Sequence, residues 1–173
     1  MDIRIGFGYD VHQLKTGNRF VLGGIIIPYK KGPVGHSDGD VLIHAICDAL
    51  LGAANLRDIG YHFPDTSEEF RGIDSKVLLK KTINLLADYG YTLGNLDCTI
   101  CLQKPKVKEY IPEMQRVLSH VMGTSEDNVS IKATTTERLG FIGNEKGIAA
   151  YAVALIQRKY KRTGKGSNRA DNQ

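Results

Sequence analysis

The sequence predicts a single small domain that combines α-helices and β-strands. Its 173 residues are close to the usual length of one domain. Hydrophobic residues make up 42% and charged residues 24%, a globular balance that excludes disorder over most of the chain. Segments with the alternating pattern of strands are interspersed with segments that carry the apolar stripe of a helix. These observations favour an α/β fold around one core.

Two strands are expected at the N-terminal end. Residues 3–9 alternate apolar with other side chains, and Gly6 and Gly8 leave room for a close neighbour. Residues 19–27 predict a second strand or a hairpin. Residues 29–40 are rich in turn-forming residues and predict a loop.

The first helix is expected over residues 41–54. It should begin near Ser37 or Asp38, because either side chain can cap it. Residues 55–74 are polar and show little periodicity. They predict a long connection of the kind that is often functional or mobile.

A second, amphipathic helix is expected to open at Asp74 or Ser75 and to stop at Gly90. Its apolar face consists of Leu78, Thr82, Leu85, Leu86 and Tyr89. Residues 95–103 then predict a strand with one buried face. That face consists of Leu96, Cys98, Ile100 and Leu102.

The remaining elements are a helix, a strand and one ambiguous segment. Pro112 suits the first turn of a helix whose apolar stripe is Met114, Val117, Leu118 and Val121. Residues 129–133 alternate as a strand. Residues 147–158 are ambiguous, since alanine favours a helix while the glycines and β-branched residues allow a strand. The domain is expected to span residues 1–159, followed by a basic, disordered tail over residues 160–173.

Composition excludes several classes of protein. Cys47, Cys98 and Cys101 are too few for a disulfide framework and favour a reducing compartment. Cys98 and Cys101 would face opposite sides of a strand, which predicts neither a zinc knuckle nor a redox pair. No apolar run approaches the roughly 20 residues of a membrane span, and no secretory signal is visible. The net charge of +4 comes from the basic end, where a solvated tail is favoured over nucleic-acid binding because aromatic residues are few.

Three residues are candidate metal ligands. Asp10 and His12 are two apart on an extended segment and point to the same side, and His44 lies on the first helix. Three such ligands with a free fourth position are typical of catalytic zinc. The alternative is a hydrogen-bonded surface pair, because Asp and His often occur together. Asp40, His44 and Asp48 share one helix face, so Asp48 is expected to bond the second ring nitrogen of His44.

Two further segments are suited to phosphate. The loop at residues 35–40 places His36 and Ser37 at a helix start, where N–H groups and polar side chains can meet an anion. Residues 132–137 end a strand in three threonine hydroxyls and the carboxylate of Glu137, which suit phosphate oxygens and magnesium. Threonines also form strands well, so this run alone leaves both interpretations open.

Together these blocks resemble the 2-C-methyl-D-erythritol 2,4-cyclodiphosphate synthase family. The resemblance rests on Asp10-x-His12, HSDGDVLIHAICDALLGAANLRDIGYHFPDT, YTLGNLDCTI and KATTTERLGFIGNEKGIAAYAVAL, in order over about residues 3–158. The HSDGD and TTTE blocks are specific to that family. The resemblance implies a metal-dependent lyase of non-mevalonate isoprenoid biosynthesis. It would convert 4-diphosphocytidyl-2-C-methyl-D-erythritol 2-phosphate to 2-C-methyl-D-erythritol 2,4-cyclodiphosphate and release CMP.

The resemblance also implies a fold and an assembly. Members are homotrimers of a small α/β domain, with a mixed sheet covered by helices on one face and active sites between subunits around a threefold axis. By this resemblance residues 147–158 form a strand. We expect a bacterial cytoplasmic enzyme, or a plastid stromal enzyme whose transit peptide was removed, with neither a membrane nor a nucleic acid as partner.

The resemblance further assigns roles to individual residues. The ligands of zinc, or of another divalent transition metal, match Asp10, His12 and His44. Glu137 matches the ligand of a second ion, magnesium or manganese, and His36 and Thr135 match positions that stabilise the transition state. Substrate contacts match Ser37, Asp58, Ile59, Gly60, Phe63, Pro64, Asp65, Thr66, Ser67, Leu102, Gln103, Lys104, Pro105, Lys106, Val107, Lys108, Thr134, Thr136, Phe141 and Asn144.

One position departs from the family pattern. Many members carry an arginine at the position of Asn144, where it is thought to hold an isoprenoid diphosphate in a central cavity. Asparagine lacks that bidentate cationic donor. The sequence therefore predicts weak or no binding of farnesyl diphosphate.

Two rival functions use the same residues. A zinc phosphoesterase would activate water at the open metal site and release free phosphate. A binding module would use the metal for structure and the basic tail for RNA.

Overall fold

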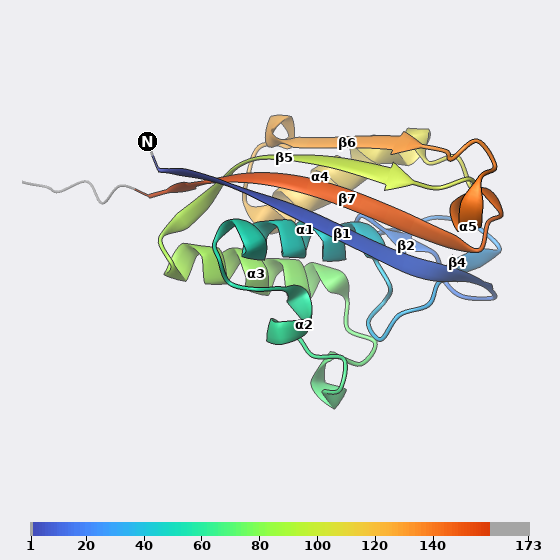
Figure 1. The fold of residues 1–173 in the computed structure, drawn as a ribbon, viewed down its shortest axis with the longest axis horizontal. Coiled ribbons are helices and arrows are strands. Elements are labelled where there is room, and N and C mark those ends of the chain that lie inside the picture. The colour runs from blue at the N-terminus through green and yellow to red at the C-terminus, as the bar shows by residue number, and fades with distance from the viewer. Residues whose placement is uncertain (1, 160–173) are drawn as a thin grey trace, which may run out of the picture.

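The computed structural model describes residues 2–159, which form a small α/β domain with a mixed sheet (Figure 1). The strand order is β4-β1-β7-β5-β6. These strands are β1 (Ile3–Thr16), β4 (Lys31–Pro33), β5 (Tyr91–Cys101), β6 (Val129–Thr134) and β7 (Gly147–Arg158). β5 and β6 are parallel, and the other pairs are antiparallel. A separate hairpin consists of β2 (Val21–Leu22) and β3 (Ile25–Ile26). The predicted disordered tail, residues 160–173, lies outside the described residues.

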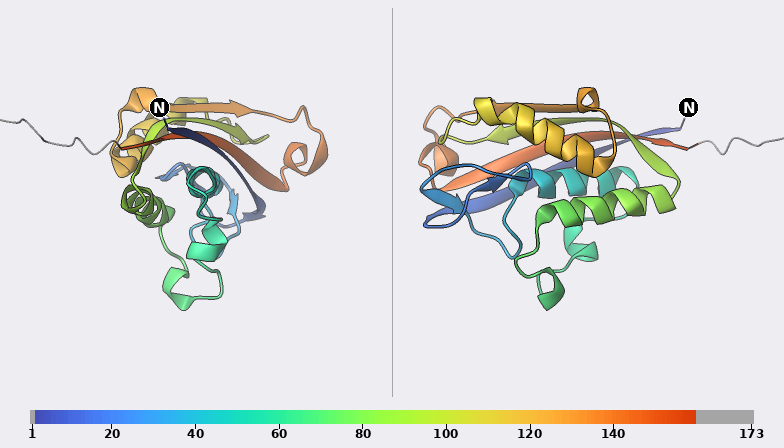
Figure 2. Two further views of the ribbon diagram at one scale, coloured as in Figure 1. Left: turned by 60° about the vertical axis from the view of Figure 1, so that its left-hand side comes forward. Right: turned by 180° about the vertical axis from the view of Figure 1, so that it is seen from behind.

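Three helices lie on one side of the sheet (Figure 2). They are α1 (Val41–Ala53), α3 (Ser75–Asp88) and α4 (Ile111–Met122). The connections contain α2 (Ile59–His62), α5 (Gly140–Gly143) and the 3-10 turns Glu68–Phe70, Lys108–Tyr110 and Glu126–Asn128. The predicted mixed sheet with helices is therefore confirmed. Among residues 2–159, no helix is long and apolar enough to cross a membrane.

Small residues allow α1 to lie close against the sheet. Gly6 and Gly8 of β1 pair with Ala154 and Ala152 of β7. A Cβ atom at Gly8 would lie only 1.9 Å from the carbonyl oxygen of Ala45 in α1. The prediction of a close neighbour at the two glycines is confirmed. The buried alanines of residues 147–158 also lie on the strand that α1 contacts, and their small side chains allow the same close approach. This contact explains how an alanine-rich segment forms a buried strand.

The start of α1 differs from the prediction. Its N-cap is Asp40, whereas the sequence predicted Ser37 or Asp38. The Asp40 carboxylate is fully buried and accepts N–H groups from the first turn of α1 and from the turn at residues 23–24. Burial raises its pKa, although the backbone donors act in the opposite direction. This cap fixes the helix to the β2–β3 hairpin.

Other boundaries show smaller differences. The first strand continues to Thr16 instead of ending near residue 9, and the expected loop at residues 29–40 contains β4. The long connection at residues 55–74 contains α2 and a 3-10 turn. Asp74 caps α3 as predicted, with its side chain accepting the N–H of Lys76.

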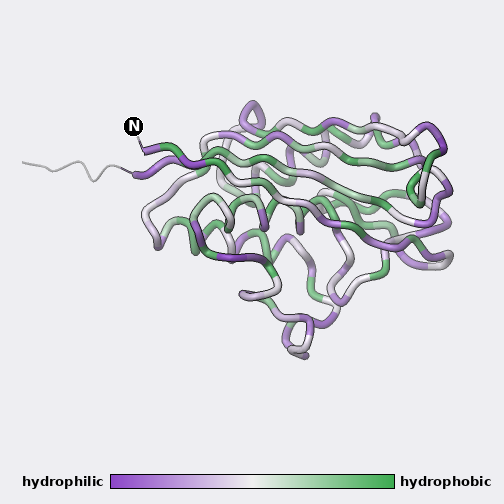
Figure 3. The backbone as a smooth tube through the Cα atoms, viewed as in Figure 1, coloured by the Kyte–Doolittle hydropathy of each residue, from purple (hydrophilic) through white to green (hydrophobic). Residues whose placement is uncertain are grey.

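The face of the sheet opposite the helices carries exposed apolar side chains. Phe7 and Tyr9 of β1 are 63% and 43% exposed, and Tyr151 and Val153 of β7 are 37% and 42% exposed. The rings of Tyr9 and Tyr151 lie 5.0 Å apart. Hydrophobic residues recur along both strands (Figure 3). Contiguous exposed apolar patches are typical of surfaces that bind proteins, membranes or ligands.

Candidate active site

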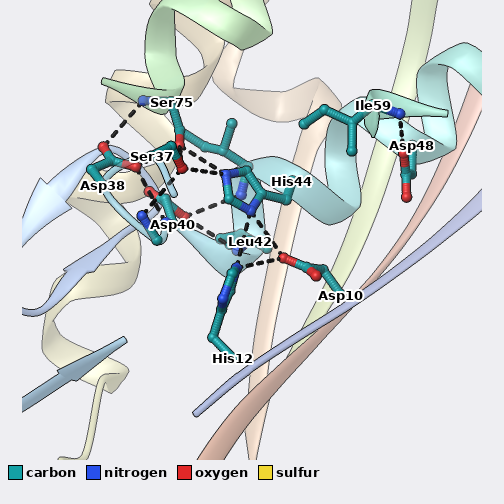
Figure 4. A network of polar contacts seen from close by, with 12 residues as sticks. Asp10, His12, Ser37, Asp38, Asp40, Leu42, His44, Asp48, Ile59 and Ser75 are labelled. Carbon is teal, nitrogen blue, oxygen red and sulfur yellow. Dashed lines mark hydrogen bonds and ion pairs between the residues drawn. The ribbon is translucent and has the colours of Figure 1, made fainter. Parts of the chain in front are cut away.

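Three potential ligand atoms converge where β1 faces α1. Asp10 Oδ2 lies 3.0 Å from His12 Nε2 and 3.0 Å from His44 Nδ1. The two histidine nitrogens are 3.1 Å apart. The three predicted ligands therefore point toward one another (Figure 4), and together they form a possible metal-binding group.

The local fold explains this convergence. The even-numbered residues of β1 face the helices, so Asp10 and His12 continue the row that begins with Gly6 and Gly8. His44 follows Asp40 by one turn of α1 and reaches the same row. The close approach of α1 at Gly8 thus brings the His44 ring to the strand.

The electrostatics of the group favour an ionised carboxylate. Burial disfavours the charge on Asp10, but hydrogen bonds and charge interactions with His12 and His44 outweigh it and lower its pKa. Burial also disfavours charge on His12, but Asp10 outweighs this effect and raises the pKa of the imidazole. His12 Nδ1 lies 2.7 Å from the carbonyl oxygen of Val34, which leaves Nε2 facing the group. A positive charge is therefore stabilised here.

The second nitrogen of His44 does not meet Asp48, so that prediction is wrong. His44 Nε2 lies 3.0 Å from the hydroxyls of Ser37 and Ser75. Helix side chains tilt toward the N-terminus, which directs this ring away from a residue one turn later. Asp48 instead accepts the N–H of Ile59 at 2.8 Å, and burial raises its pKa. It positions the loop before α2.

A pocket of about 300 Å³ opens beside the three potential ligands. It is lined by His12, His36, Ser37, His44, Ile59, Gly60, Phe63, Asp65, Phe70 and Leu78. His36 Nε2 is 3.2 Å from the carbonyl oxygen of Ser67. Asp58 caps α2 by accepting the N–H of Tyr61. Of the predicted substrate-contact residues between Asp58 and Ser67, four do not line the pocket, namely Asp58, Pro64, Thr66 and Ser67.

A second pocket, also of about 300 Å³, lies at the ends of β5 and β6. It is lined by Leu102, Pro105, Lys106, Val107, Lys108, Ala133, Thr134 and Thr135. The Gln103 side chain accepts the N–H of Arg138, which joins the two loops. Lys104 forms an ion pair with Glu145 at 3.7 Å. Six of the predicted substrate-contact residues therefore line this pocket and not the one beside the metal group, namely Leu102, Pro105, Lys106, Val107, Lys108 and Thr134.

The threonine run next to this pocket is bonded within itself. Thr135 Oγ1 donates to Glu137 Oε1 at 2.8 Å, and Thr136 Oγ1 donates to the carbonyl oxygen of Leu139 at 2.7 Å. Glu137 and Arg138 both have positive φ angles, of 50° and 65°. Adjacent non-glycine residues in this conformation are uncommon and often occur at functional sites.

The predicted site is thus divided between two separate pockets. Within residues 2–159, no residue lines both of them. Phe141 lies on α5 and is 47% exposed, and the amide of Asn144 donates to the carbonyl oxygen of Gly140 at 2.8 Å. The sequence did not identify Ser75 as a neighbour of His44, or Asp38 as the hydrogen-bond partner of Ser75. The only available signals were the HSDGD block and the helix start at Ser75.

Comparison with known proteins gives the family. The YgbB family model matches residues 3–157. The chain belongs to the YgbB family. A relative from Bacteroides fragilis, named 2-C-methyl-D-erythritol 2,4-cyclodiphosphate synthase, is 63% identical over 91% of this chain and 99% of its own. A relative of the same name from Cytophaga hutchinsonii is 54% identical over 90% of this chain and 98% of its own.

Solved structures of YgbB relatives share the fold. The bifunctional IspDF of Campylobacter jejuni is 39% identical with a TM-score of 0.88, over 91% of this chain and 43% of that chain. IspF of Plasmodium falciparum, in a CDP complex, is 34% identical with a TM-score of 0.81, over 92% of this chain and 98% of that chain. The resemblance drawn from the sequence is confirmed.

Proposed function

We propose that this protein is a 2-C-methyl-D-erythritol 2,4-cyclodiphosphate synthase of non-mevalonate isoprenoid biosynthesis. Its substrate is 4-diphosphocytidyl-2-C-methyl-D-erythritol 2-phosphate. An oxygen of the 2-phosphate attacks the β-phosphorus, the bond from that phosphorus to the bridging oxygen breaks, and CMP leaves. Since attacking and leaving groups belong to one molecule, holding it in a folded conformation supplies much of the rate enhancement.

Asp10, His12 and His44 fit a zinc ion, or another divalent transition metal. Two imidazole nitrogens and one carboxylate oxygen form an accepted donor set, and three protein ligands leave a fourth position for substrate. When bound, zinc would supply a Lewis acid that neutralises a phosphate oxygen. The protein orients both rings through the carbonyl of Val34 and the hydroxyls of Ser37 and Ser75.

The pocket residues around this group would hold the methylerythritol part. Ser37 and His36 lie at its rim, and His36 would donate a hydrogen bond to phosphate oxygens that gain charge in the transition state. Asp58, Ile59 and Gly60 would bind the diol. The residues from Phe63 to Ser67 would close over it and exclude water.

The second pocket would hold the cytidine diphosphate part. Residues 102–108 would form the base and ribose site, and Thr134, Thr135 and Thr136 would donate hydroxyls to phosphate oxygens. Glu137 would provide a carboxylate ligand for magnesium or manganese, since these ions prefer oxygen ligands. The CDP complex of the Plasmodium falciparum relative supports a cytidine nucleotide in this fold.

A homotrimer would bring the two pockets together. The metal group and the nucleotide pocket have no lining residue in common, so a neighbouring subunit would supply the second part of each site. The exposed apolar face of β1 and β7 supports burial against other copies around a threefold axis. The bacterial relatives support a location in the bacterial cytoplasm.

The convergence of Asp10, His12 and His44 in a YgbB chain carries this proposal. The test is incubation of the protein with the substrate, zinc and magnesium, followed by phosphorus NMR. We expect equal amounts of CMP and cyclodiphosphate, lost in His44→Ala and retained in His120→Ala, which changes an exposed histidine on α4. CMP with a linear phosphate product would instead indicate a phosphoesterase. Free phosphate without CMP would also indicate a phosphoesterase, and the absence of both CMP and free phosphate would refute both enzymatic functions.

A further inference from the structure

The far side of the His44 ring contacts two serine hydroxyls. Nε2 lies 3.0 Å from the Oγ atoms of Ser37 and Ser75, while Nδ1 lies 3.0 Å from Asp10 Oδ2 (Figure 4). A neutral imidazole carries one proton, on one of its two nitrogens. The Asp10 carboxylate favours a proton on Nδ1, so the hydrogen bonds of Nε2 must favour the other tautomer if the lone pair of Nδ1 is to be available to a metal.

Asp38 determines the direction of the Ser75 hydroxyl. Ser75 is fully buried, and its Oγ lies 2.5 Å from Asp38 Oδ1. Its backbone N–H donates to Asp38 Oδ2 at 3.1 Å. Asp38 Oδ1 also accepts the N–H of Asp40 at 3.2 Å. Since a carboxylate only accepts hydrogen bonds, the single hydroxyl proton of Ser75 is directed at Asp38.

Ser75 consequently offers only lone pairs to His44. These lone pairs are satisfied when Nε2 carries the ring proton, and they repel an unprotonated Nε2 at this distance. The Ser37 hydroxyl imposes no such direction, because it can donate or accept and already accepts the N–H of Gly39 at 3.3 Å. The preference for a protonated Nε2 therefore originates at Asp38.

We propose that Asp38 and Ser75 are positioning residues for His44. They favour the ring proton on Nε2 when an ion takes the place of the proton that Nδ1 donates to Asp10 in the metal-free protein, so that the lone pair of Nδ1 is free for the ion. This inference rests on the proposed metal site and adds two residues outside the ligand set. The chain just before Ser75 also holds the backbone of His36, because the N–H of Gly72 donates to the carbonyl oxygen of His36 at 2.8 Å.

Zinc affinity provides the first test. We expect Ser75→Ala and Asp38→Asn to weaken zinc binding about 10- to 100-fold, the usual effect of removing a group that orients a ligand. In Asp38→Asn the amide can donate to Ser75 and release its hydroxyl proton toward Nε2. Competition with a chromophoric chelator measures the affinity. Asp74→Asn is the matched control, since its carboxylate is exposed, pairs with Lys76 and keeps a helix-capping group after the change.

Nitrogen NMR of the zinc-loaded protein provides the second test. We expect the wild type to show a proton on His44 Nε2 that exchanges slowly with water, and Ser75→Ala to show much faster exchange. A merely structural role would lower the thermal midpoint without this change. Should Ser75→Ala fail to fold, the nearly isosteric Asp38→Asn carries the test.

Three outcomes would overturn the inference. One is zinc bound through Nε2, and another is an affinity within threefold of wild type in both folded variants. These outcomes leave the proposed enzyme intact. Failure of the wild type to bind zinc would overturn the inference together with the proposed metal site.

Discussion

The two pockets satisfy their polar groups in different ways. Around the metal group, hydrogen bonds join segments far apart in the chain, such as His12 to Val34 and His44 to Ser75. Around the proposed nucleotide pocket, the threonine run bonds mainly within itself, as in the contact of Thr135 with Glu137. The first group is partly buried between a strand and a helix, whereas the second is exposed at strand ends.

This difference indicates which polar groups are already held in place by their own chain and which remain available to a ligand. The metal group is organised by one chain, because strand, helix, loop and α3 all contribute to its orientation. The hydroxyls and carboxylate of the nucleotide pocket have only local partners and are available to phosphates and a cation. A shared site would therefore combine an ordered metal region from one subunit with an adaptable nucleotide region from its neighbour.

Mixed trimers give the largest expected effect. His44→Ala should lower turnover at least about a thousandfold by removing a ligand of the Lewis acid, and Glu137→Gln should impair the other pocket. If sites are shared, coexpression of the two variants should restore activity at about one site in three of each mixed trimer, because one junction between adjacent subunits then combines two intact regions. Purification through two different tags followed by a CMP assay measures the recovery.

The control for this experiment is a mixture of trimers that were purified separately and do not exchange subunits. It should remain as inactive as its components. Mixed trimers that show no recovery would indicate that both pockets act within one chain, and the proposed division between subunits would then be rejected.

The glycine contact beneath α1 tests whether the metal region depends on close packing. In Gly8→Ala the new Cβ would meet the backbone of Ala45, and overpacking of this kind costs about 1–3 kcal/mol. The free energy of unfolding should fall by about that amount, and zinc affinity should decrease because His44 moves away from β1. CDP affinity should stay unchanged. Urea unfolding and calorimetry measure these quantities.

Gly52→Ala is the matched control in the same helix. No heavy atom lies within 4 Å of its added Cβ, and alanine has the higher helix propensity, so stability should rise by up to about 1 kcal/mol. A Gly8→Ala protein with wild-type stability and zinc affinity would show that the close approach of α1 does not support the metal group.

The pH dependence of zinc binding tests which side chains of the metal group carry charge before the ion binds. Zinc requires a neutral imidazole, and the pKa of His12 is raised above its usual 6.5 in the metal-free protein. Apparent affinity should be constant above that pKa and fall about tenfold per pH unit below it. Asp10 contributes no change near neutrality, because its pKa is lowered and it stays ionised. Calorimetry in buffers of different ionisation enthalpy should detect the released proton, and its absence below pH 6.5 would contradict the assignment.

Sequence patterns predicted the two regions unequally. Gly6 and Gly8 predicted a close neighbour because they lack side chains, and the Asp10-x-His12 spacing predicted a shared face because strand side chains alternate. Both predictions need only local sequence. The strand over residues 147–158 could not be decided from composition, since its alanines reflect the approach of α1. Periodicity also cannot reveal that Ser75 faces His44, 31 positions earlier, because that contact depends on how two helices pack.

Binding of an isoprenoid diphosphate has the smallest expected effect, because neither pocket contributes to it. The Asn144 amide already donates to Gly140 at the end of α5, and it carries no charge to attract a diphosphate. We expect calorimetry with farnesyl diphosphate to show weak or no binding, and Asn144→Arg to strengthen it without altering zinc affinity. Tight stoichiometric binding by the wild type that survives removal of magnesium would contradict this expectation. Such binding would show that a cationic side chain at position 144 is not needed to hold the diphosphate.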